Sequence, residues 1–391
     1  MTDQPLPFIP YGRQNITEDD IQAVNEVLRS DFITQGPAID AFEEDIKRVT
    51  KAEHAVACSS ATAGLHIAYQ ALDLGPGDIL WTVSNTFVAT ANAALLLGAE
   101  VDFVDISLTS YNMCPVKLRD KLEKAKEADR LPKIVAPVHF GGLSCDMEAI
   151  HLLAQEFGFK IVEDASHCIG ASQHNKPVGG CKYSDMAVFS FHPVKIITTG
   201  EGGVVTTNNA ELAEKLKMLR THGITKDNDK LQYANNYAWY FEQQMLSTNY
   251  RMTDIQAALG SSQLKRLDKI VKARHQLAYQ YDILLANVRD VKAAPRDVRH
   301  QSSWHLYVAH VPPYKRRKVF NHMRKQNIGV AVHYIPVHSH PYYKDLGFKN
   351  TGLENTMAYY NGAITLPMFP ELTDDDQKRV VDALAQGLMT E

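Results

Sequence analysis

Short apolar runs recur along the first half of the chain, and each is bounded by turn residues. Runs of this length are typical of buried strands in a parallel sheet. Stretches with helical spacing separate them, so the pattern predicts an α/β fold with a mainly parallel sheet covered on both faces. The clearest runs are His54–Cys58, Asp78–Val83, Val101–Val104, Ile134–Val138 and Met186–Phe191.

Two helical patterns carry recognisable start signals. Residues 15–30 have apolar positions at helical spacing, with Thr17 as the expected N-cap. Thr253 and Gln256 form a capping box that opens a second pattern, which continues to Tyr281. The second pattern predicts one long amphipathic helix.

The length of the predicted elements changes after this long helix. Beyond Pro295 the predicted elements are shorter, with strands expected at 304–310 and 328–334. We therefore expect a large domain over residues 1–250. Residues 251–391 are expected to hold the linking helix and a small C-terminal domain.

Composition narrows the class of protein. The chain has 391 residues, of which 45% are hydrophobic and 22% charged, as in soluble globular proteins. A net charge of −4 gives no reason to expect nucleic acid or an acidic membrane as partner. No apolar run is long enough to span a bilayer, and the N-terminus lacks a signal-peptide pattern. Five scattered cysteines without a C-x-x-C pair indicate free thiols, so we expect a cytoplasmic protein.

Two charged residues stand where predicted strands end. Asp164 closes the apolar run that begins at Ile161, and Lys195 follows the run Met186–Phe191. In open α/β sheets, ligands bind beyond these strand ends. A lysine held there, away from water, can lose its proton and attack a carbonyl carbon. Either residue alone is weak evidence, but the pair suggests pyridoxal phosphate (PLP), with a lysine for the Schiff base and an acid for the pyridinium nitrogen.

Two further features fit such a cofactor without requiring it. Small residues at 59–64 lie between a strand and a helix, where free backbone N–H groups and the helix dipole favour an anion such as phosphate. Phe87 follows another strand and is either ordinary core or a surface for a planar ring.

The stretch around Lys195 resembles the sugar aminotransferases of the DegT/DnrJ/EryC1/StrS family. Their pattern is an acidic strand end followed by S-F-H-x-x-K and T-T-G-E-G-G, and this chain has Ser190, Phe191, His192, Lys195 and 198–203 in that order. The resemblance covers nearly the full chain. It implies the fold type I of PLP-dependent transferases, similar to aspartate aminotransferase, with a mainly parallel seven-stranded sheet and a smaller C-terminal α/β domain.

The resemblance also implies roles for individual residues. Lys195 and Asp164 would be catalytic, and Asn249 would act from the partner subunit of a homodimer. The residues expected to bind PLP are Ala61, Thr62, Phe87, Asp164, His167, Ser190, Lys195 and Asn249. Those expected to contact substrate are Tyr11, Asp31, Phe32, Ile33, Thr34, Ala61, Ser190, Asn249, His333, Tyr334, Ile335 and Pro336.

Three histidines between 333 and 340 could in principle bind a metal. However, no carboxylate or cysteine lies beside them at ligand spacing, and Pro336 interrupts the run. We therefore expect no metal site. In the resembled family this H-Y-x-P-x-H run closes over the sugar nucleotide.

Within the family, H-P-V-K-I-I-T-T-G-E-G-G and N-Y-R-M-T-D-I-Q-A-A-L-G are most similar to the aminotransferases of pseudaminic acid biosynthesis. This implies transfer of an amino group from L-glutamate to C4 of a UDP-linked 4-keto-6-deoxy-N-acetylhexosamine, UDP-2-acetamido-2,6-dideoxy-β-L-arabino-hex-4-ulose. One alternative is a C3 or C4 transaminase acting on a TDP- or GDP-linked keto-sugar. The family's dehydratases carry histidine in place of the lysine, so Lys195 argues against them. A non-enzymatic nucleotide-sugar binding protein is a third reading.

Overall fold

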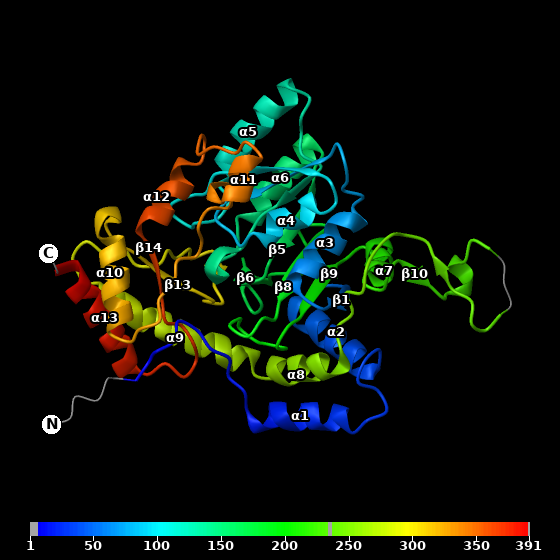
Figure 1. Cartoon of the computed structure of the whole chain (residues 1–391), viewed down its shortest axis with the longest axis horizontal. Coiled ribbons are helices and arrows are strands. Elements are labelled where there is room, and N and C mark those ends of the chain that lie inside the picture. The colour runs from blue at the N-terminus through cyan, green and yellow to red at the C-terminus, as the bar shows by residue number, and fades with distance from the viewer. Residues whose placement is uncertain (1–6, 234–236, 390–391) are drawn as a thin grey trace.

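The computed structural model describes residues 7–233 and 237–389, and its centre is a seven-stranded sheet (Figure 1). The strand order is β1-β9-β8-β5-β4-β2-β3, and only β9 runs antiparallel to its neighbours. The predicted α/β class with a mainly parallel sheet is therefore confirmed. The strands are β1 (His54–Cys58), β2 (Ile79–Val83), β3 (Glu100–Val104), β4 (Ile134–Ala136), β5 (Lys160–Asp164), β8 (Met186–Ser190) and β9 (Gly203–Thr207).

Alternate side chains of each strand enter different cores. On β8, Met186 and Val188 join one apolar cluster, whereas Ala187 and Phe189 join another on the opposite face. Because both faces are buried, the strands read as continuous apolar runs in the sequence. The covering helices are α2 (Pro37–Thr50), α3 (Ala61–Ala71), α4 (Ala89–Leu95), α5 (Pro115–Glu127), α6 (Met147–Phe157), α7 (Ala210–Leu219) and α8 (Asp254–Leu264).

The predicted long helix is two helices, so that expectation was wrong in one respect. The capping box of Thr253 and Gln256 is present, but α8 ends at Leu264 and α9 (Leu267–Leu285) begins after a break. At the break, Arg266 donates to the carboxylate of buried Asp20 at 2.6 Å. Apolar spacing continues across the break, so periodicity could not reveal it.

The C-terminal part has its own apolar core around an antiparallel strand pair. Trp304 has a φ of +52°, so the strand predicted at 304–310 begins only at Tyr307. The strand predicted at 328–334 does not form, because this segment makes only single bridges to Ile9 and Thr365. The elements here are β13 (Tyr307–His310), β14 (Ala363–Leu366), α10 (Pro313–Lys325), α11 (Pro341–Asp345), α12 (Glu354–Gly362) and α13 (Asp374–Met389).

The helix predicted at the N-terminus is α1 (Glu18–Leu28), and Thr17 N donates to the Asp20 carboxylate at 2.9 Å. Its orientation is unusual, because Asp20 is buried while Ile21 is 46% and Leu28 54% exposed. The apolar side of α1 thus faces outward.

A short hairpin extends away from the body (Figure 1). Within the described residues, no helix has both the length and the apolar character needed to cross a bilayer, and the five cysteines are free. The remaining short elements are β6 (Ser172–Gln173), β7 (Lys176–Pro177) and β12 (His300–Gln301), the hairpin strands β10 (Ile224–Thr225) and β11 (Glu242–Gln243), and 3₁₀ turns at Phe140–Gly142, Asn228–Lys230 and Val337–Ser339.

Candidate active site

A cavity of about 500 Å³ lies where β5 and β8 end, and we call it the Lys195 cavity. It brings together residues that are far apart in the sequence. Of the residues predicted to form the site, those lining it are Tyr11, Ala61, Thr62, Phe87, Asp164, His167, Ser190, Lys195, His333 and Tyr334.

Asp164 is the last residue of β5 and is only 5% exposed. Thr90 donates its hydroxyl to Oδ2 at 2.7 Å, and the backbone N–H of Ser166 donates to Oδ1 at 3.2 Å. Both donors fix the direction of the carboxylate. Asp164 thus places a buried, oriented carboxylate at the cavity wall.

The neighbouring carboxylate, Glu163, points to the other face of the sheet, as strand geometry requires. It bonds to His139 Nε2 at 2.6 Å and also accepts the hydroxyl of Ser184. The backbone N–H of Cys145 donates to His139 Nδ1 at 3.1 Å, so the ring proton lies on Nε2 and points to Glu163. Glu163 therefore belongs to the packing behind the site.

Lys195 lies in the loop after β8, with its side chain at the cavity wall. Burial lowers the pKa of Lys195 to about 8, although the charge of Asp164 acts in the opposite direction. A lysine with this pKa is neutral in a substantial fraction of molecules near neutral pH. It can therefore act as a nucleophile or a base.

The start of α3 forms another part of the wall. Ser60 is the N-cap and accepts from the N–H of Ala63 at 3.1 Å. Ala61 and Thr62, in the first helical turn, line the cavity together with Ser190. N–H groups of a first turn have no partner within the helix, so this corner suits an anion.

The close approach of β9 to this corner requires glycine. A Cβ at Gly203 would lie 2.5 Å from the carbonyl carbon of Ser60 and 2.7 Å from Ala61 N. Any larger residue would push the helix start away from the sheet.

The rings of three aromatic residues, Phe87, Tyr334 and Tyr11, lie on the walls. Phe87 is 59% exposed, and its ring centroid lies 6.2 Å from that of Tyr334. A phenylalanine this exposed inside a cavity offers a face to a planar ligand. Tyr11 completes this side, with its ring 5.6 Å from that of His333.

His167 is buried, and its proton position can be inferred. The N–H of Gly141 donates to Nδ1 at 3.2 Å, so the ring proton is on Nε2, which is 3.2 Å from the Tyr334 hydroxyl. Burial and the nearby Lys195 hold the pKa of His167 well below its usual range. His167 is thus a neutral hydrogen-bond donor.

The histidine-rich segment after residue 332 is held against the sheet end by buried bonds. His338 Nδ1 pairs with the Ser84 hydroxyl at 2.7 Å, and Nε2 with Asn350 Oδ1 at 2.9 Å. His333 Nδ1 pairs with the Thr365 hydroxyl at 2.8 Å. These bonds account for two of the three histidines and fix the segment that carries Tyr334.

The other predicted residues do not line this cavity. Ile335 and Pro336 follow Tyr334 but lie outside the lining. The loop from Asp31 to Thr34 and Asn249 are exposed. Their roles remain predictions.

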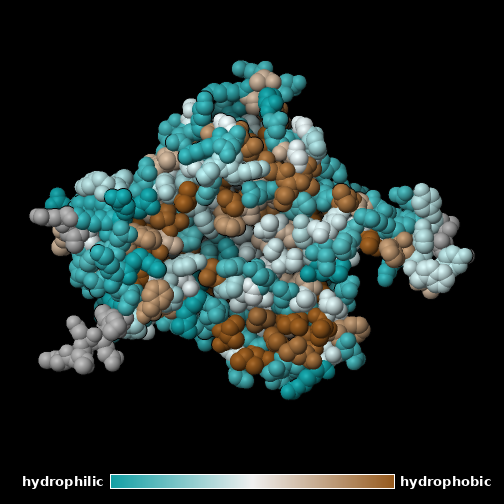
Figure 2. Space-filling view, viewed as in Figure 1, coloured by the Kyte–Doolittle hydropathy of each residue, from teal (hydrophilic) through white to brown (hydrophobic). Residues whose placement is uncertain are grey.

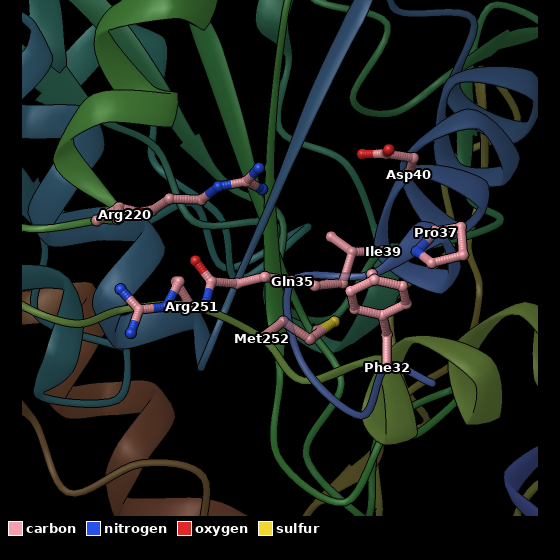
Figure 3. Close-up of a pocket in the computed structure, with 10 residues that line it drawn as sticks. Phe32, Gln35, Pro37, Ile39, Asp40, Arg220, Arg251 and Met252 are labelled. Carbon is pink, nitrogen blue, oxygen red and sulfur yellow. The ribbon is translucent and has the colours of Figure 1, made fainter. Parts of the chain in front are cut away.

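Of these exposed residues, Phe32 lines a second hollow of about 400 Å³, which we call the Phe32–Arg251 hollow (Figure 3). Arg220 and Arg251 lie on one side of it, and Phe32 and Asp40 on the other (Figure 3). Asn249, two residues before Arg251, pairs with Thr221 through a backbone bridge. Among the predicted substrate residues, Phe32 therefore lines this hollow and not the Lys195 cavity.

Some residues at the Lys195 cavity were not predicted. Thr90 orients Asp164, and its only sequence signal was its place in the turn after β2. His192, Glu201 and His305 also line the wall. His305 had been placed inside a predicted strand, where no pattern marked it as special.

Comparison with known proteins extends the similarity to the whole chain. Residues 14–385 match the DegT/DnrJ/EryC1/StrS aminotransferase family. The spore coat polysaccharide biosynthesis protein SpsC of Bacillus subtilis is 38% identical over 385 residues, which is 96% of each chain. The UDP-4-amino-4,6-dideoxy-N-acetyl-β-L-altrosamine transaminase of Campylobacter jejuni is 36% identical over 380 residues, again 96% of each chain.

Solved structures agree. Helicobacter pylori PseC, an aminotransferase involved in the biosynthesis of pseudaminic acid, matches with a TM-score of 0.89 at 28% identity, over 97% of this chain and 99% of that one. A Streptococcus pneumoniae chain described as a sugar aminotransferase, in its PLP form, matches with a TM-score of 0.87 at 27% identity, over 98% and 100% of the two chains.

Proposed function

Because the chain belongs to the DegT/DnrJ/EryC1/StrS aminotransferase family, we propose that it transfers an amino group from an amino acid to the keto group of a nucleotide-linked sugar. The family's aminotransferases are PLP-dependent, and solved relatives include PLP and PMP forms. The observation that carries the proposal is the placement of Lys195 and Asp164 on the wall of one cavity.

The residues of the Lys195 cavity include a suitable partner for each polar group of PLP and for its ring. Asp164, buried and oriented, suits the pyridinium nitrogen, and Phe87 offers its face to the ring. The first turn of α3 with Ser190 suits the phosphate, and the Nε2–H of His167, shared with the Tyr334 hydroxyl 3.2 Å away, suits the phenolic oxygen. When bound, PLP supplies a carbonyl that accepts an amine and a ring that takes up electrons released at the reacting carbon.

Lys195 has two tasks in this scheme. As a neutral amine it would hold the cofactor, and when free of it, Nζ would take the proton from the donor's Cα. Its pKa of about 8 matches both tasks, because such an amine accepts and returns protons near neutral pH. The same Nζ would deliver a proton to the sugar carbon in the second half of the cycle.

Asp164 would hold a proton on the ring nitrogen of bound PLP. Its two oxygens are oriented by Thr90 and Ser166, so the charge does not have to reorganise during the reaction. Phe87, Tyr334 and Tyr11 limit water around the reacting groups.

For the sugar, we propose a UDP-linked 4-keto-6-deoxy-N-acetylhexosamine aminated at C4 with L-glutamate as donor, a step of pseudaminic acid biosynthesis. The support is the names of the Campylobacter jejuni and Helicobacter pylori relatives, together with the segments around Lys195 and Asn249. The rival is another nucleotide keto-sugar, since the slightly more similar SpsC is named for spore coat polysaccharide. The free cysteines accord with the reducing cytoplasm in which such sugars would be used.

One experiment tests both levels of this proposal. Purified protein with PLP and glutamate is incubated with a panel of UDP-, TDP- and GDP-linked keto-sugars, and products are identified by NMR. Amination of the UDP-4-keto-6-deoxy-N-acetylhexosamine at C4 supports the specific assignment, and amination of another sugar replaces it. A colourless protein that binds sugars without turnover would overturn the enzymatic assignment.

We further propose a homodimer in which Asn249 serves the partner's cavity. On a single chain Asn249 is exposed and lies outside its own Lys195 cavity. An apolar patch on one face of the molecule also supports the dimer (Figure 2). A hollow of about 340 Å³ between α1 and α8, which we call the α1/α8 groove, has apolar and polar lining residues. The apolar ones are Ala23, Val27, Phe32, Pro37, Ala38 and Ala258, and the polar ones are Glu26, Ser30, Asp254, Ser261, Ser262 and Lys265.

A charge placed in the α1/α8 groove tests the dimer. Val27→Asp should shift the protein from dimer to monomer in sedimentation, because an unpaired charge is costly in an apolar interface. The matched control is Val116→Asp on α5, where the native side chain is already 67% exposed. A Val27→Asp protein that remains dimeric would show that the interface lies elsewhere.

A further inference from the structure

The segment before β13 brings one more imidazole, His305, to the wall of the Lys195 cavity. Ser303 holds this segment, donating its N–H to the Gly142 carbonyl at 3.0 Å and its hydroxyl to the His167 carbonyl at 2.8 Å. From the other side, fully buried Arg274 donates to the His305 carbonyl at 3.4 Å. His305 is therefore fixed in the site by bonds from both sides.

The ring of His305 differs from the other buried rings at this wall. It is 4% exposed, its centroid lies 4.4 Å from that of His167, and its Nδ1 has no hydrogen-bond partner among the described residues. His167 and His333 are both hydrogen-bonded within the chain. Among the described residues lining the cavity, His305 alone has a buried side-chain nitrogen without such a bond.

A buried imidazole without a partner costs free energy unless a ligand supplies one. Resting on the function proposed above, we propose that His305 donates a hydrogen bond to the carboxylate that the amino donor carries next to its reacting carbon. His305 would then be a specificity-determining residue for the first half of the reaction.

The chemistry of the two substrates favours the donor. An α-amino acid has its carboxylate on the carbon that reacts, so this charge must lie close to Lys195. The keto-sugar has no charge at its reacting carbon, and its diphosphate is several bonds away. In the described part of the chain, the cavity lining holds no arginine and no lysine besides Lys195. The carboxylate must therefore accept hydrogen bonds from neutral donors, or bind a group from another subunit.

The alternatives among the imidazoles are weaker. Both nitrogens of His167 have neighbours, at Gly141 N and the Tyr334 hydroxyl. His333 Nδ1 is paired with Thr365, and His192 is exposed. Burial also holds the pKa of His305 well below its usual range, so the ring is a neutral N–H donor. A neutral donor can bind a carboxylate without repelling the positive charge near Lys195.

Binding of glutarate, a dicarboxylate without an amine, tests the inference apart from turnover. Calorimetry on the PLP-loaded protein compares wild type, His305→Phe and His305→Asn, whose amide nitrogen takes the place of Nδ1. We expect His305→Phe to weaken glutarate binding about tenfold or more, the loss typical of a hydrogen bond to a charged group. His305→Asn should recover most of this affinity.

Half-reactions then separate recognition from a structural effect. Glutamate converts the yellow PLP form to the colourless aminated form. The glutamate concentration that gives half of this absorbance loss should rise by the same factor in His305→Phe. The rate of the keto-sugar half-reaction should stay within about twofold of wild type. His275→Phe is the matched control, because His275 also has an unpartnered ring nitrogen but does not line the cavity.

Two results would overturn the inference. One is unchanged glutarate binding in His305→Phe, which would assign the carboxylate to a partner's residue. The other is that both His305 variants lose glutarate affinity, PLP affinity and the rate of the sugar half-reaction to the same extent. His305 would then be a structural support of His167. If wild type binds glutarate through His305 yet no keto-sugar is aminated, the proposed function fails while this inference stands.

Discussion

The Lys195 cavity and the Phe32–Arg251 hollow have similar volumes, about 500 and 400 Å³, but are built differently. Strand ends and a helix start supply the first, and its key groups are buried and hydrogen-bonded. Loop residues supply much of the second, among them Phe32, which is 55% exposed, and Arg251.

The difference separates two parts of the proposed reaction. Chemistry at the cofactor needs groups fixed to within a fraction of an ångström, and a parallel sheet fixes them within one chain. Recognition of a long nucleotide sugar can use loops and, in our proposal, a second subunit. The predictions below test this division, beginning with the largest effect.

Replacing Lys195 by arginine should abolish amino transfer, with a loss of about 10⁴-fold or more. A guanidinium cannot become neutral, so it can neither hold the cofactor covalently nor carry the proton. Turnover is measured with glutamate and the preferred keto-sugar. Persistent transamination by this variant would contradict the role given to Lys195.

Replacing Asp164 by asparagine should reduce turnover by about 10²–10³-fold while leaving the fold intact, because the ring nitrogen loses its charged partner. The matched control lies one position earlier on β5. Glu163→Gln changes a carboxylate of equal burial that faces the other side of the sheet, and should stay within about threefold of wild type. Equal effects of the two variants would show that the side of the sheet does not matter.

The attachment of PLP to cofactor-free protein should depend on pH through Lys195. Its pKa is lowered to about 8, so the neutral amine dominates above that pH and declines below it. The attachment rate should therefore rise about tenfold per pH unit up to pH ~8 and then level off. Stopped-flow absorbance measures this rate. A rise that continues to pH ~10 would mean an ordinary, solvated lysine.

Hybrid dimers test the second region. The Lys195→Arg protein and the Asn249→Asp protein should each be nearly inactive alone. In the second, the new carboxylate would repel the phosphate of PLP. Co-expressed with two different tags, each hybrid dimer should recover about half the wild-type activity, since one cavity has both an intact Lys195 and the partner's intact Asn249. No recovery in purified hybrids would place Asn249 in its own chain's site.

The shared location of Asp164 and Lys195 could be predicted because the ends of buried strands can be recognised in the sequence. Apolar runs that end in Asp164 and precede Lys195 predict a shared sheet edge, and both residues line one cavity. Side-chain alternation explains why Asp164 faces the cavity and Glu163 does not.

What could not be predicted depends on contacts between distant segments. The break between α8 and α9 involves Arg266 and buried Asp20, nearly 250 residues apart in the chain. His305 enters the cavity because Trp304 adopts a positive φ and Ser303 bonds to the His167 carbonyl. The outward apolar side of α1 reflects a buried Asp20, which periodicity alone does not indicate. Local sequence patterns do not indicate contacts between residues so far apart in the chain.

The most direct test of the account is the chemical identity of the residue that holds PLP. Protein loaded with PLP is reduced with borohydride, digested and examined by mass spectrometry. The account predicts a single modified peptide, with the pyridoxyl phosphate mass on Lys195. A label on another lysine, or a yellow protein that leaves Lys195 unmodified, would contradict it.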